Sequence, residues 1–320
     1  MTRVGVLACG RMAHIAGVWG PIIEPSVDKG GLAAAQTRMT DLRLTHVWDI
    51  DRRLADAFGH KYGATVVDEY GDMVGKVDGI ILDDFDSCLH FKDLARPYLE
   101  AGVPMFINRP FALSLADAGQ IIALGQKHDT PILSGSSFEY APELKEIRRQ
   151  VAAATPISGY CVANSSTDYA SHGVHGLFFA YACVGGGIRS VAYQTRDWRS
   201  SGGTLRIEHE GRDGGLPFTG SVKETANDCG RFSLCGQQGF DTAVETNTAF
   251  WVAIVQAMQK LFQTRRMPQT YEQLYEKTQL FLAGFKSHVE CGGAPVPIDQ
   301  IGDWQAPLLN PDPYPEGFFA

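Results

Sequence analysis

The sequence lacks both a long apolar run and a basic run. No apolar stretch approaches the roughly 18–20 residues that a membrane-spanning helix needs. The opening residues, MTRVGVLACG, lead directly into an apolar segment and show no cleavable signal peptide. The formal net charge is −8, and Lys and Arg form no run of five or more residues. We therefore expect a cytoplasmic protein with neither a membrane nor a nucleic acid as partner.

Closely spaced cysteine pairs are lacking as well. The seven cysteines are an odd number, lie far apart and include no C-x-x-C pair. This pattern predicts neither a disulfide framework nor a cysteine zinc site. We expect reduced and mostly buried thiols.

Alternating strands and helices dominate the first part of the chain. Its 320 residues suit about two domains. Strands are predicted at 3–8, 43–48, 77–82, 103–107 and 131–137, and helices at 52–62, 90–101 and 114–127. This rhythm is typical of βαβ units, so we predict an α/β Rossmann domain over residues 1–130.

The alternation of single strands with helices ends at about residue 150. Segments 157–167 and 188–235 alternate as antiparallel strands do, and helices are predicted at 168–183, 243–263 and 271–289. We therefore predict an α+β domain with a large open, mainly antiparallel sheet over residues 131–320, which ends in a proline-rich extended tail.

A dinucleotide fingerprint follows the first predicted strand. The pattern G-x-G-x-x-G is represented by Ala8-Cys9-Gly10-Arg11-Met12-Ala13, in which Gly10 lets the backbone approach a pyrophosphate and Ala8 departs from the pattern. Asp49 ends the second predicted strand, where a carboxylate favours NAD over NADP. Arg52 and Arg53 follow it and keep NADP as an alternative. The other interpretation is a Rossmann-like fold with an empty or altered site.

Five segments in order resemble the glucose–fructose oxidoreductase / inositol dehydrogenase / MocA (Gfo/Idh/MocA) family. They are EAGVPMFINRPFALSLADAGQII (100–122), GSSFEYAPELKEI (135–147), Asp168 to His175, RRMPQTYEQLYE (265–276) and FKSHVECGGAPVPID (285–299). The resemblance implies a Rossmann domain joined to an open-sheet domain, NAD(P)-dependent oxidation or reduction of sugars and polyols, and a homodimer or homotetramer.

The resemblance also extends the predicted cofactor site. It adds residues that follow the strands predicted at 77–82 and 103–107 to those of the fingerprint and Asp49. The added residues are Asp84, Phe85, His90, Asn108 and Arg109.

The predicted catalytic residues depart from the family pattern. Arg109 stands where the family has a lysine; arginine stays charged, so it clamps an oxygen but cannot act as a base. The alternative is a structural arginine before a turn proline, and we expect the Arg109–Pro110 bond to be cis.

Asp168, His172 and His175 share one helix face. His172 matches the family histidine and can act as a general acid or base, and Asp168 would orient it or stabilise its charge. His175 replaces a family aspartate, and the alternative is that one of these histidines is a core residue. The spacing also resembles a metal site, but no further ligand is evident, so we predict no metal.

Substrate contacts are predicted at Asp86, Glu139, Tyr140 and Tyr169. Asp86 belongs to an acidic segment, Asp83-Asp84-Phe85-Asp86, that either grips sugar hydroxyls, repels anions, binds a cation or is solvated. Tyr140, Tyr169 and Trp198 either stack on a sugar or pack in the core.

The leading hypothesis is an NAD-dependent oxidoreductase of a sugar, a polyol or a sugar derivative. A second hypothesis is a redox-neutral, NAD-assisted enzyme that cleaves a glycoside or acts as a lyase. A third is a catalytically silent ligand-binding protein on the same scaffold.

Overall fold

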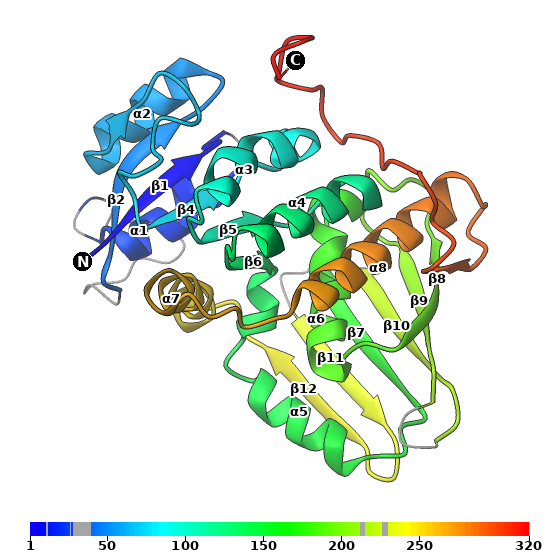
Figure 1. Ribbon diagram of the computed structural model, residues 1–320. Coiled ribbons are helices and arrows are strands. Elements are labelled where there is room, and N and C mark those ends of the chain that lie inside the picture. Colours follow the sequence, from blue (N-terminus) through cyan, green and yellow to red (C-terminus); the bar gives the residue numbers. More distant parts are fainter. Residues whose placement is uncertain (11, 26, 28–39, 212–214, 226–229, 320) are drawn as a thin grey trace. The chain divides into compact units, whose positions relative to one another are not determined.

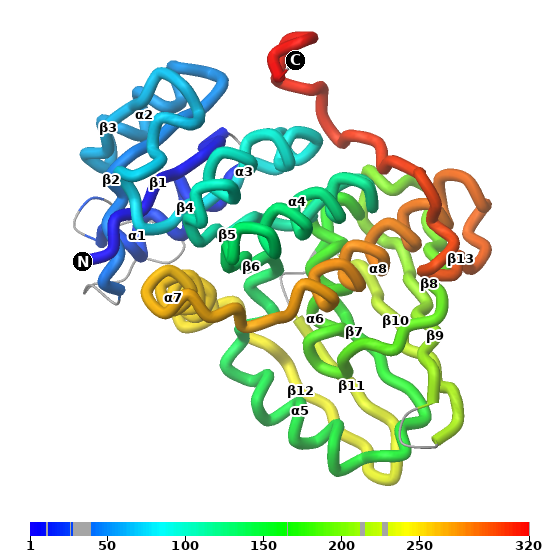
Figure 2. The backbone as a smooth tube through the Cα atoms, viewed as in Figure 1, coloured from blue at the N-terminus to red at the C-terminus, as the bar shows by residue number. Residues whose placement is uncertain are grey.

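A computed structural model describes residues 1–10, 12–25, 27, 40–211, 215–225 and 230–319. The chain forms two compact units, which are considered separately here (Figures 1 and 2). Unit 1 comprises Met1–Gly135, Asn247–Tyr271 and Asn310–Ala320, and unit 2 comprises Ser136–Thr246 and Glu272–Leu309. The predicted boundary at residue 130 lies close to the first crossing between the units, but three later crossings were not expected.

Unit 1 is built on a six-stranded parallel sheet in the order β3-β2-β1-β4-β5-β6. Its strands are β1 (Thr2–Leu7), β2 (Leu42–Trp48), β3 (Thr65–Val66), β4 (Gly79–Leu82), β5 (Met105–Asn108) and β6 (Ile132–Gly135). Every residue of β4, β5 and β6 is buried, as expected for strands covered on both faces. The order reverses beside β1, which is where such sheets bind ligands, and the predicted Rossmann domain is confirmed.

Seven helical segments accompany this sheet in the described part of unit 1. They are η1 (Ile15–Trp19, a π-helix), α1 (Gly20–Ile23), α2 (Arg52–Tyr62), η2 (Phe85–His90), α3 (Phe91–Glu100), α4 (Leu115–Lys127) and α7 (Thr248–Thr264). The Asp51 carboxylate caps α2 by accepting from the N–H of Arg53, and Gly63 ends the helix with a positive φ of 70°.

Helix α7 packs in unit 1, although the sequence placed it in the second domain. It contacts η1, α1, β1 and β6, and its apolar side chains Phe250, Ile254, Val255, Met258 and Leu261 are buried. The ring of Phe262 lies against Gly79, where a side chain would collide with it. An apolar helix face does not reveal which sheet it covers, which explains the difference.

Unit 2 is built on a seven-stranded sheet in the order β12-β11-β7-β10-β9-β8-β13. Its strands are β7 (Gly159–Ser165), β8 (Ile188–Gln194), β9 (Thr204–His209), β10 (Phe218–Thr225), β11 (Gly230–Cys235), β12 (Phe240–Val244) and β13 (Val296–Pro297). Among the described strands, β7 and β10 pair in parallel and every other pair is antiparallel. The predicted mainly antiparallel sheet is confirmed.

The helices of unit 2 hold the predicted catalytic segment against this sheet. They are η3 (Ser137–Tyr140), α5 (Leu144–Ala153), η4 (Tyr169–Gly173, a π-helix), α6 (Val174–Val184) and α8 (Tyr271–Val289). Helix α6 contacts β7 and β10 and is buried at nearly every position. At Gly176 a Cβ would lie 2.6 Å from Val222 and 3.0 Å from Asn164, so glycine permits this close packing.

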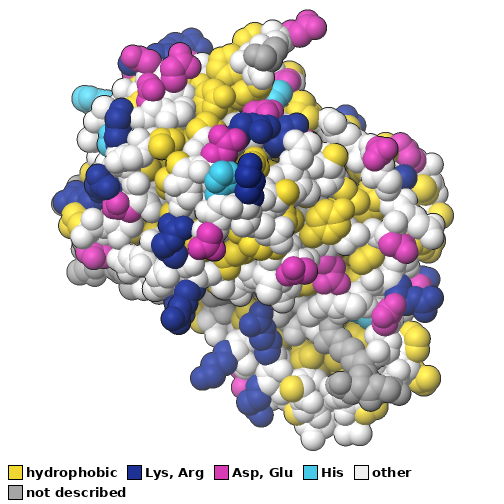
Figure 3. All heavy atoms as spheres, in the orientation of Figure 1, with side chains coloured by type: hydrophobic (Ala, Val, Ile, Leu, Met, Phe, Trp, Pro, Cys, Tyr) yellow, Lys and Arg dark blue, Asp and Glu magenta, His cyan; other side chains and the backbone are white. Residues whose placement is uncertain are grey.

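Charged side chains of both signs are interspersed on the face of the molecule drawn in Figure 3. Within the described ranges, no helix is long and apolar enough to cross a membrane.

Candidate active site

The loop between β1 and η1 carries the fingerprint residues. Ala8 has a φ of 57°, the left-handed conformation that glycine adopts at lower cost. Its N–H donates to the carbonyl of Trp48 at 2.9 Å, and its carbonyl accepts from the N–H of Asp84 at 3.0 Å. These bonds fasten the loop to the ends of β2 and β4, so Ala8 holds the conformation that the fingerprint requires. Arg11, a predicted cofactor residue, lies outside the described residues.

Carboxylates of the chain itself accept from three amides of this loop. The N–H of Cys9 donates to Asp49 Oδ2 at 2.7 Å, and that of Ile15 donates to Asp83 Oδ2 at 2.5 Å. The N–H of Met12 donates to Asp84 Oδ1 at 3.2 Å. The sequence-predicted Gly10, Met12, Asp49 and Asp84 are therefore brought together, and Ala13 joins them through its N–H, which donates to the carbonyl of Gly10 at 3.1 Å.

The three carboxyl groups lie in a poorly hydrated setting. Burial, with the neighbouring charges of Asp86 and Asp49, raises the pKa of Asp84 to about 7 against the pull of the Met12 amide. Burial raises the pKa of Asp83 to about 8, opposed by the Ile15 amide and the Arg109 guanidinium. Burial also raises the pKa of Asp49.

Arg109 follows β5 and is buried, with an exposed fraction of 2%. Its Nη2 lies 3.3 Å from Nε2 of His14, whose ring stacks on Trp19. The Arg109–Pro110 bond is cis, as predicted. Asn108 is also buried: its amide nitrogen donates to Asp83, and its Oδ1 accepts from the N–H of Arg109. Asn108 thus links the ends of β4 and β5.

The C-terminal tail engages the acidic segment after β4. Asn310 donates to Asp86 Oδ1 at 2.8 Å, and Asp312 lies 2.8 Å from Nε2 of His90. The hydroxyl of Tyr314 donates to Ser87 Oγ at 3.1 Å. Of the other predicted cofactor residues, Phe85 is buried.

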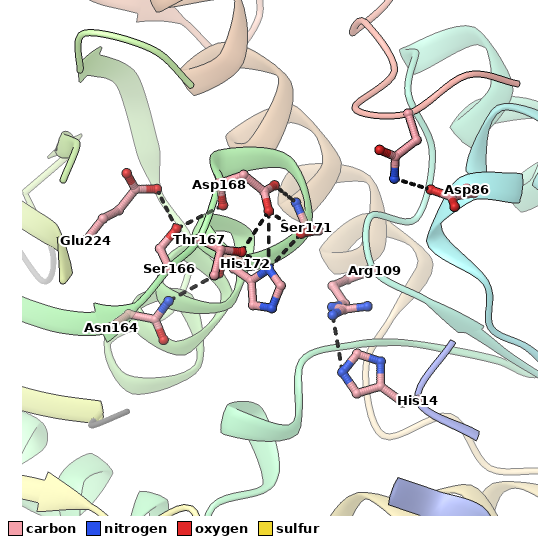
Figure 4. A network of polar contacts seen from close by, with 11 residues as sticks. His14, Asp86, Arg109, Asn164, Ser166, Thr167, Asp168, Ser171, His172 and Glu224 are labelled. Carbon is pink, nitrogen blue, oxygen red and sulfur yellow. Dashed lines mark hydrogen bonds and ion pairs between the residues drawn. The ribbon is translucent and has the colours of Figure 1, made fainter. Parts of the chain in front are cut away.

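Unit 2 contains an aspartate–histidine pair (Figure 4). Asp168 caps η4: its Oδ1 accepts from the N–H of Ser171 at 2.6 Å. Its Oδ2 lies 3.2 Å from Nδ1 of His172 and also accepts from the hydroxyls of Thr167 and Ser171 at 3.0 and 2.5 Å. Burial alone would raise the pKa of Asp168, but the hydrogen bonds from His172 and Ser171 hold it below its usual value.

The hydrogen-bond pattern shows which ring nitrogen of neutral His172 carries the proton. Nδ1 faces Ser171 Oγ at 2.7 Å, Thr167 Oγ1 at 2.8 Å and the Asp168 carboxylate. Because both hydroxyls give their protons to Asp168, Nδ1 must be the donor in the neutral ring, which leaves a lone pair on Nε2. The side chain is 38% exposed, so Nε2 is accessible as a base.

His175 lies one turn further along, 6.1 Å from the His172 ring between centroids. Its Nδ1 is 2.6 Å from Ser136 Oγ. Ser136 begins η3 with a capping box in which its N–H donates to Glu139 at 2.7 Å. Glu139 in turn pairs with the buried Lys277 at 2.8 Å. The predicted substrate residue Glu139 thus supports the segment that holds His175.

The predicted aromatic residues differ in exposure. Tyr169 is fully buried, stacks on Tyr193 and Phe281, and donates to the carbonyl of Phe281. It therefore packs in the core and has no exposed surface for the predicted substrate contact. Trp198 is also buried, whereas Tyr140 is partly exposed.

Sequence reasoning missed Glu224 on β10. This buried carboxylate accepts from the Tyr193 hydroxyl at 2.8 Å and from the N–H of Gly203 at 2.9 Å, and Ser166 donates to it at 3.3 Å. Burial raises its pKa. It lies far in sequence from Asp168, so no local signal marks it, whereas Thr167 and Ser171 flank Asp168 in a pattern typical of a helix cap.

Comparison with known proteins identifies the class of the first domain. A family model described as an oxidoreductase family with an NAD-binding Rossmann fold matches residues 27–136. That model is the Gfo/Idh/MocA family, and over these residues it confirms the resemblance predicted from the sequence.

Solved structures share the fold of both units. A probable dehydrogenase from Thermotoga maritima has a TM-score of 0.73 and 13% identity, over 93% of this chain and 99% of that chain. A myo-inositol dehydrogenase from Lactobacillus casei, in complex with NAD(H) and myo-inositol, has a TM-score of 0.73 and 12% identity, over 93% and 96%. A putative myo-inositol dehydrogenase from Sinorhizobium meliloti has a TM-score of 0.69 and 14% identity, over 93% and 100%.

The residues of unit 1 fit NAD on one condition. The strand order, the glycine at position 10 and the carboxylate of Asp49 after β2 are features that dinucleotide sites share. The condition concerns Asp84, because its carboxylate fills the space beside Gly10 and holds the Met12 amide. In a dinucleotide site of this type the pyrophosphate approaches the backbone at this glycine, so NAD would fit when the carboxylate moves away. Among the described residues, no group of three or more His, Cys, Asp or Glu side chains could hold a metal ion.

Proposed function

We propose that the protein is an NAD-dependent oxidoreductase that acts on a CH–OH group of a sugar, a polyol or a sugar derivative. The observation that carries this proposal is the His172–Asp168 pair, which presents a basic Nε2 on a unit whose fold accompanies an NAD-binding domain. Solved relatives of the same fold include a protein named as a myo-inositol dehydrogenase.

NAD would be held by the loop of Gly10 and Met12, with Asp49 at its ribose end, and would supply the hydride acceptor or donor. During oxidation, His172 Nε2 would take the proton of the reacting hydroxyl. The imidazolium that forms would be stabilised by Asp168, which accepts from Nδ1. In the reverse direction the same nitrogen would return the proton to the carbonyl oxygen.

Arg109 and His175 would have supporting roles toward the substrate. Arg109 stays charged, so we assign it the binding of an oxygen rather than proton transfer. His175, held at Nδ1 by Ser136, would offer Nε2 to a second hydroxyl. Tyr140 would supply a ring face for the sugar.

The test combines binding with turnover. NAD affinity would be measured by calorimetry, and NADH absorbance would be followed on a panel of inositols, hexoses and their acids. We expect turnover that His172→Gln reduces by at least about a hundredfold without a loss of NAD affinity. Binding of NAD without turnover on any of these compounds, or full activity in His172→Gln, would overturn the proposal.

We also propose that the protein works in the cytoplasm as a homodimer or homotetramer, as the family resemblance implies. Light scattering coupled to size-exclusion chromatography tests the assembly, and a monomer at micromolar concentration would refute that part.

A further inference from the structure

We propose that Asp84 acts as an internal anion at the pyrophosphate position of the cofactor loop, so that NAD binding is coupled to the uptake of a proton by this carboxyl group. The inference rests on the proposed function, because it assumes that NAD is the ligand of this loop. It assigns Asp84 a role that sets when the cofactor binds.

The first argument is the space that Asp84 occupies. Fingerprint glycines leave room for a phosphate to approach the backbone. In this protein that room is taken, because a Cβ built on Gly10 would collide with Oδ2 of Asp84. The other oxygen of the same carboxylate accepts from the N–H of Met12 at 3.2 Å. The Asp84 side chain thus fills the space beside Gly10 and the Met12 N–H, here called the cradle, and accepts the hydrogen bond that this N–H can donate.

The second argument is that the backbone of Asp84 is fastened in place. Its N–H donates to the carbonyl of Ala8 at 3.0 Å, and its carbonyl accepts from the N–H of Ser87 at 3.0 Å. The residue is buried, with an exposed fraction of 6%. Release of the Met12 amide therefore requires a change of the Asp84 side-chain rotamer alone, after which the fixed backbone would keep the carboxyl group close to the phosphate that replaces it.

The third argument is the charge that surrounds this carboxyl group. Asp83 faces it from just after β4, Asp86 and Cys88 from η2, Asp49 from the end of β2, Cys9 from the loop, and Tyr314 from the C-terminal tail. The Arg109 guanidinium acts on Asp83 in the same cluster. A pyrophosphate adds negative charge to a group of acids, and protonation of Asp84 is the response that removes charge at the point of contact.

The direction of the pH dependence follows from linkage. Burial and neighbouring carboxylates already raise the pKa of Asp84 to about 7. A bound anion raises this pKa further, so binding takes up a proton above pH 7 and the affinity falls as the pH rises. If the pKa in the complex lies above 9, the Kd for NAD increases roughly 30-fold from pH 6 to pH 8.5.

The experiment is calorimetric titration of the full chain with NAD at pH 6.0 and pH 8.5, in two buffers of different ionisation enthalpy that report proton uptake. Asp84→Ala empties the cradle, and Asp84→Asn keeps its shape without the charge. The matched control is Asp86→Asn, which removes a neighbouring charge that does not contact the loop amides. Circular dichroism confirms that each variant is folded.

We expect the wild-type protein to take up close to one proton at pH 8.5 and to bind NAD roughly 30-fold more weakly there than at pH 6.0. Asp84→Ala should lose most of this dependence and bind more tightly at pH 8.5, while Asp86→Asn retains proton uptake. Wild-type binding without proton uptake, or Asp84→Ala with the wild-type slope, overturns the inference and leaves the proposed function standing. If neither the wild type nor Asp84→Ala binds NAD at either pH, the proposed function fails and the inference fails with it.

Discussion

Asp168 both caps the helix that carries His172 and lies 3.2 Å from Nδ1 of that histidine. The cap fixes the start of the helix, and the position four residues on places the imidazole over the same carboxylate. One residue therefore sets the backbone and the electrostatic environment of the proposed base. The two effects can be separated because asparagine is as good a cap as aspartate.

Asp168→Asn should lower kcat strongly and lower stability only moderately. The amide keeps the bond from the N–H of Ser171 but carries no charge to stabilise an imidazolium, so we expect a loss of about 10²- to 10⁴-fold in kcat. The unfolding free energy should fall by about 1–3 kcal/mol at neutral pH, because the cap is kept but the charge-assisted hydrogen bonds to the second carboxylate oxygen are lost. Steady-state kinetics and urea unfolding measure the two effects. A variant that retains kcat would show that the carboxylate is only a cap, and Asp168→Ala serves as the comparison that loses both functions.

Asp84→Asn should stabilise the fold more at pH 8 than at pH 5. The folded-state pKa of Asp84 is raised to about 7, above its value in the unfolded chain, so ionisation favours unfolding as the pH rises between these two values. Removal of the charge should therefore stabilise the fold by about 1–3 kcal/mol more at pH 8 than at pH 5. Urea unfolding at both pH values checks this. An equal effect at pH 5 and pH 8 would show that the carboxyl group does not titrate between them, and Asp56→Asn on the exposed face of α2 provides a surface control.

Lys277→Met should destabilise unit 2 more than the double variant Lys277→Met/Glu139→Gln. The single change leaves Glu139 buried without its 2.8 Å partner, at a cost of about 3–5 kcal/mol. The double change removes both charges, and glutamine can still accept from the N–H of Ser136. Denaturant unfolding of the wild type, Lys277→Met, Glu139→Gln and the double variant gives the coupling free energy between the two side chains. Equal losses in the single and double variants would contradict a paired role for these charges.

Removal of residues 310–320 should lower the melting temperature and expose Trp48. In the intact chain Phe318 lies 6.3 Å from Trp48 and 6.4 Å from Tyr70 between ring centroids, and Asp312 contacts His90. Truncation should shift the tryptophan emission to longer wavelength as well as lower the melting temperature. Phe318→Ala, which keeps the length of the tail, should have a smaller effect and lower the free energy of unfolding by about 1–3 kcal/mol. An unchanged emission spectrum would contradict the contact.

Much of the fold could be predicted because its signals are local. Buried parallel strands such as β4 and β5 are apolar runs, and α8 spans Tyr271–Val289, where its spacing predicted a helix. Strand β12 was missed, because its alternation is short and weak. The return of α7 to unit 1 was also missed, since the contact with Gly79 depends on residues far apart in sequence.

The candidate site was predictable where a motif fixes the backbone, as at Gly10 and Asp168. It was not predictable where side chains compete for the same atoms. The pattern around Gly10 gave no sign that Asp84 would occupy its cradle, and the sequence did not reveal that Glu139 would find Lys277. Pairings of this kind depend on tertiary packing and leave no periodic trace.

The first unit is assembled from three stretches of chain, and the second of them carries α7. Because α7 begins at Thr248, β1 and β6 cannot acquire the helix that covers part of them until residues 136–246 of unit 2 have been synthesised as well. Residues 1–135 alone would leave apolar surface exposed, so the two units cannot complete their folding strictly one after the other along the chain.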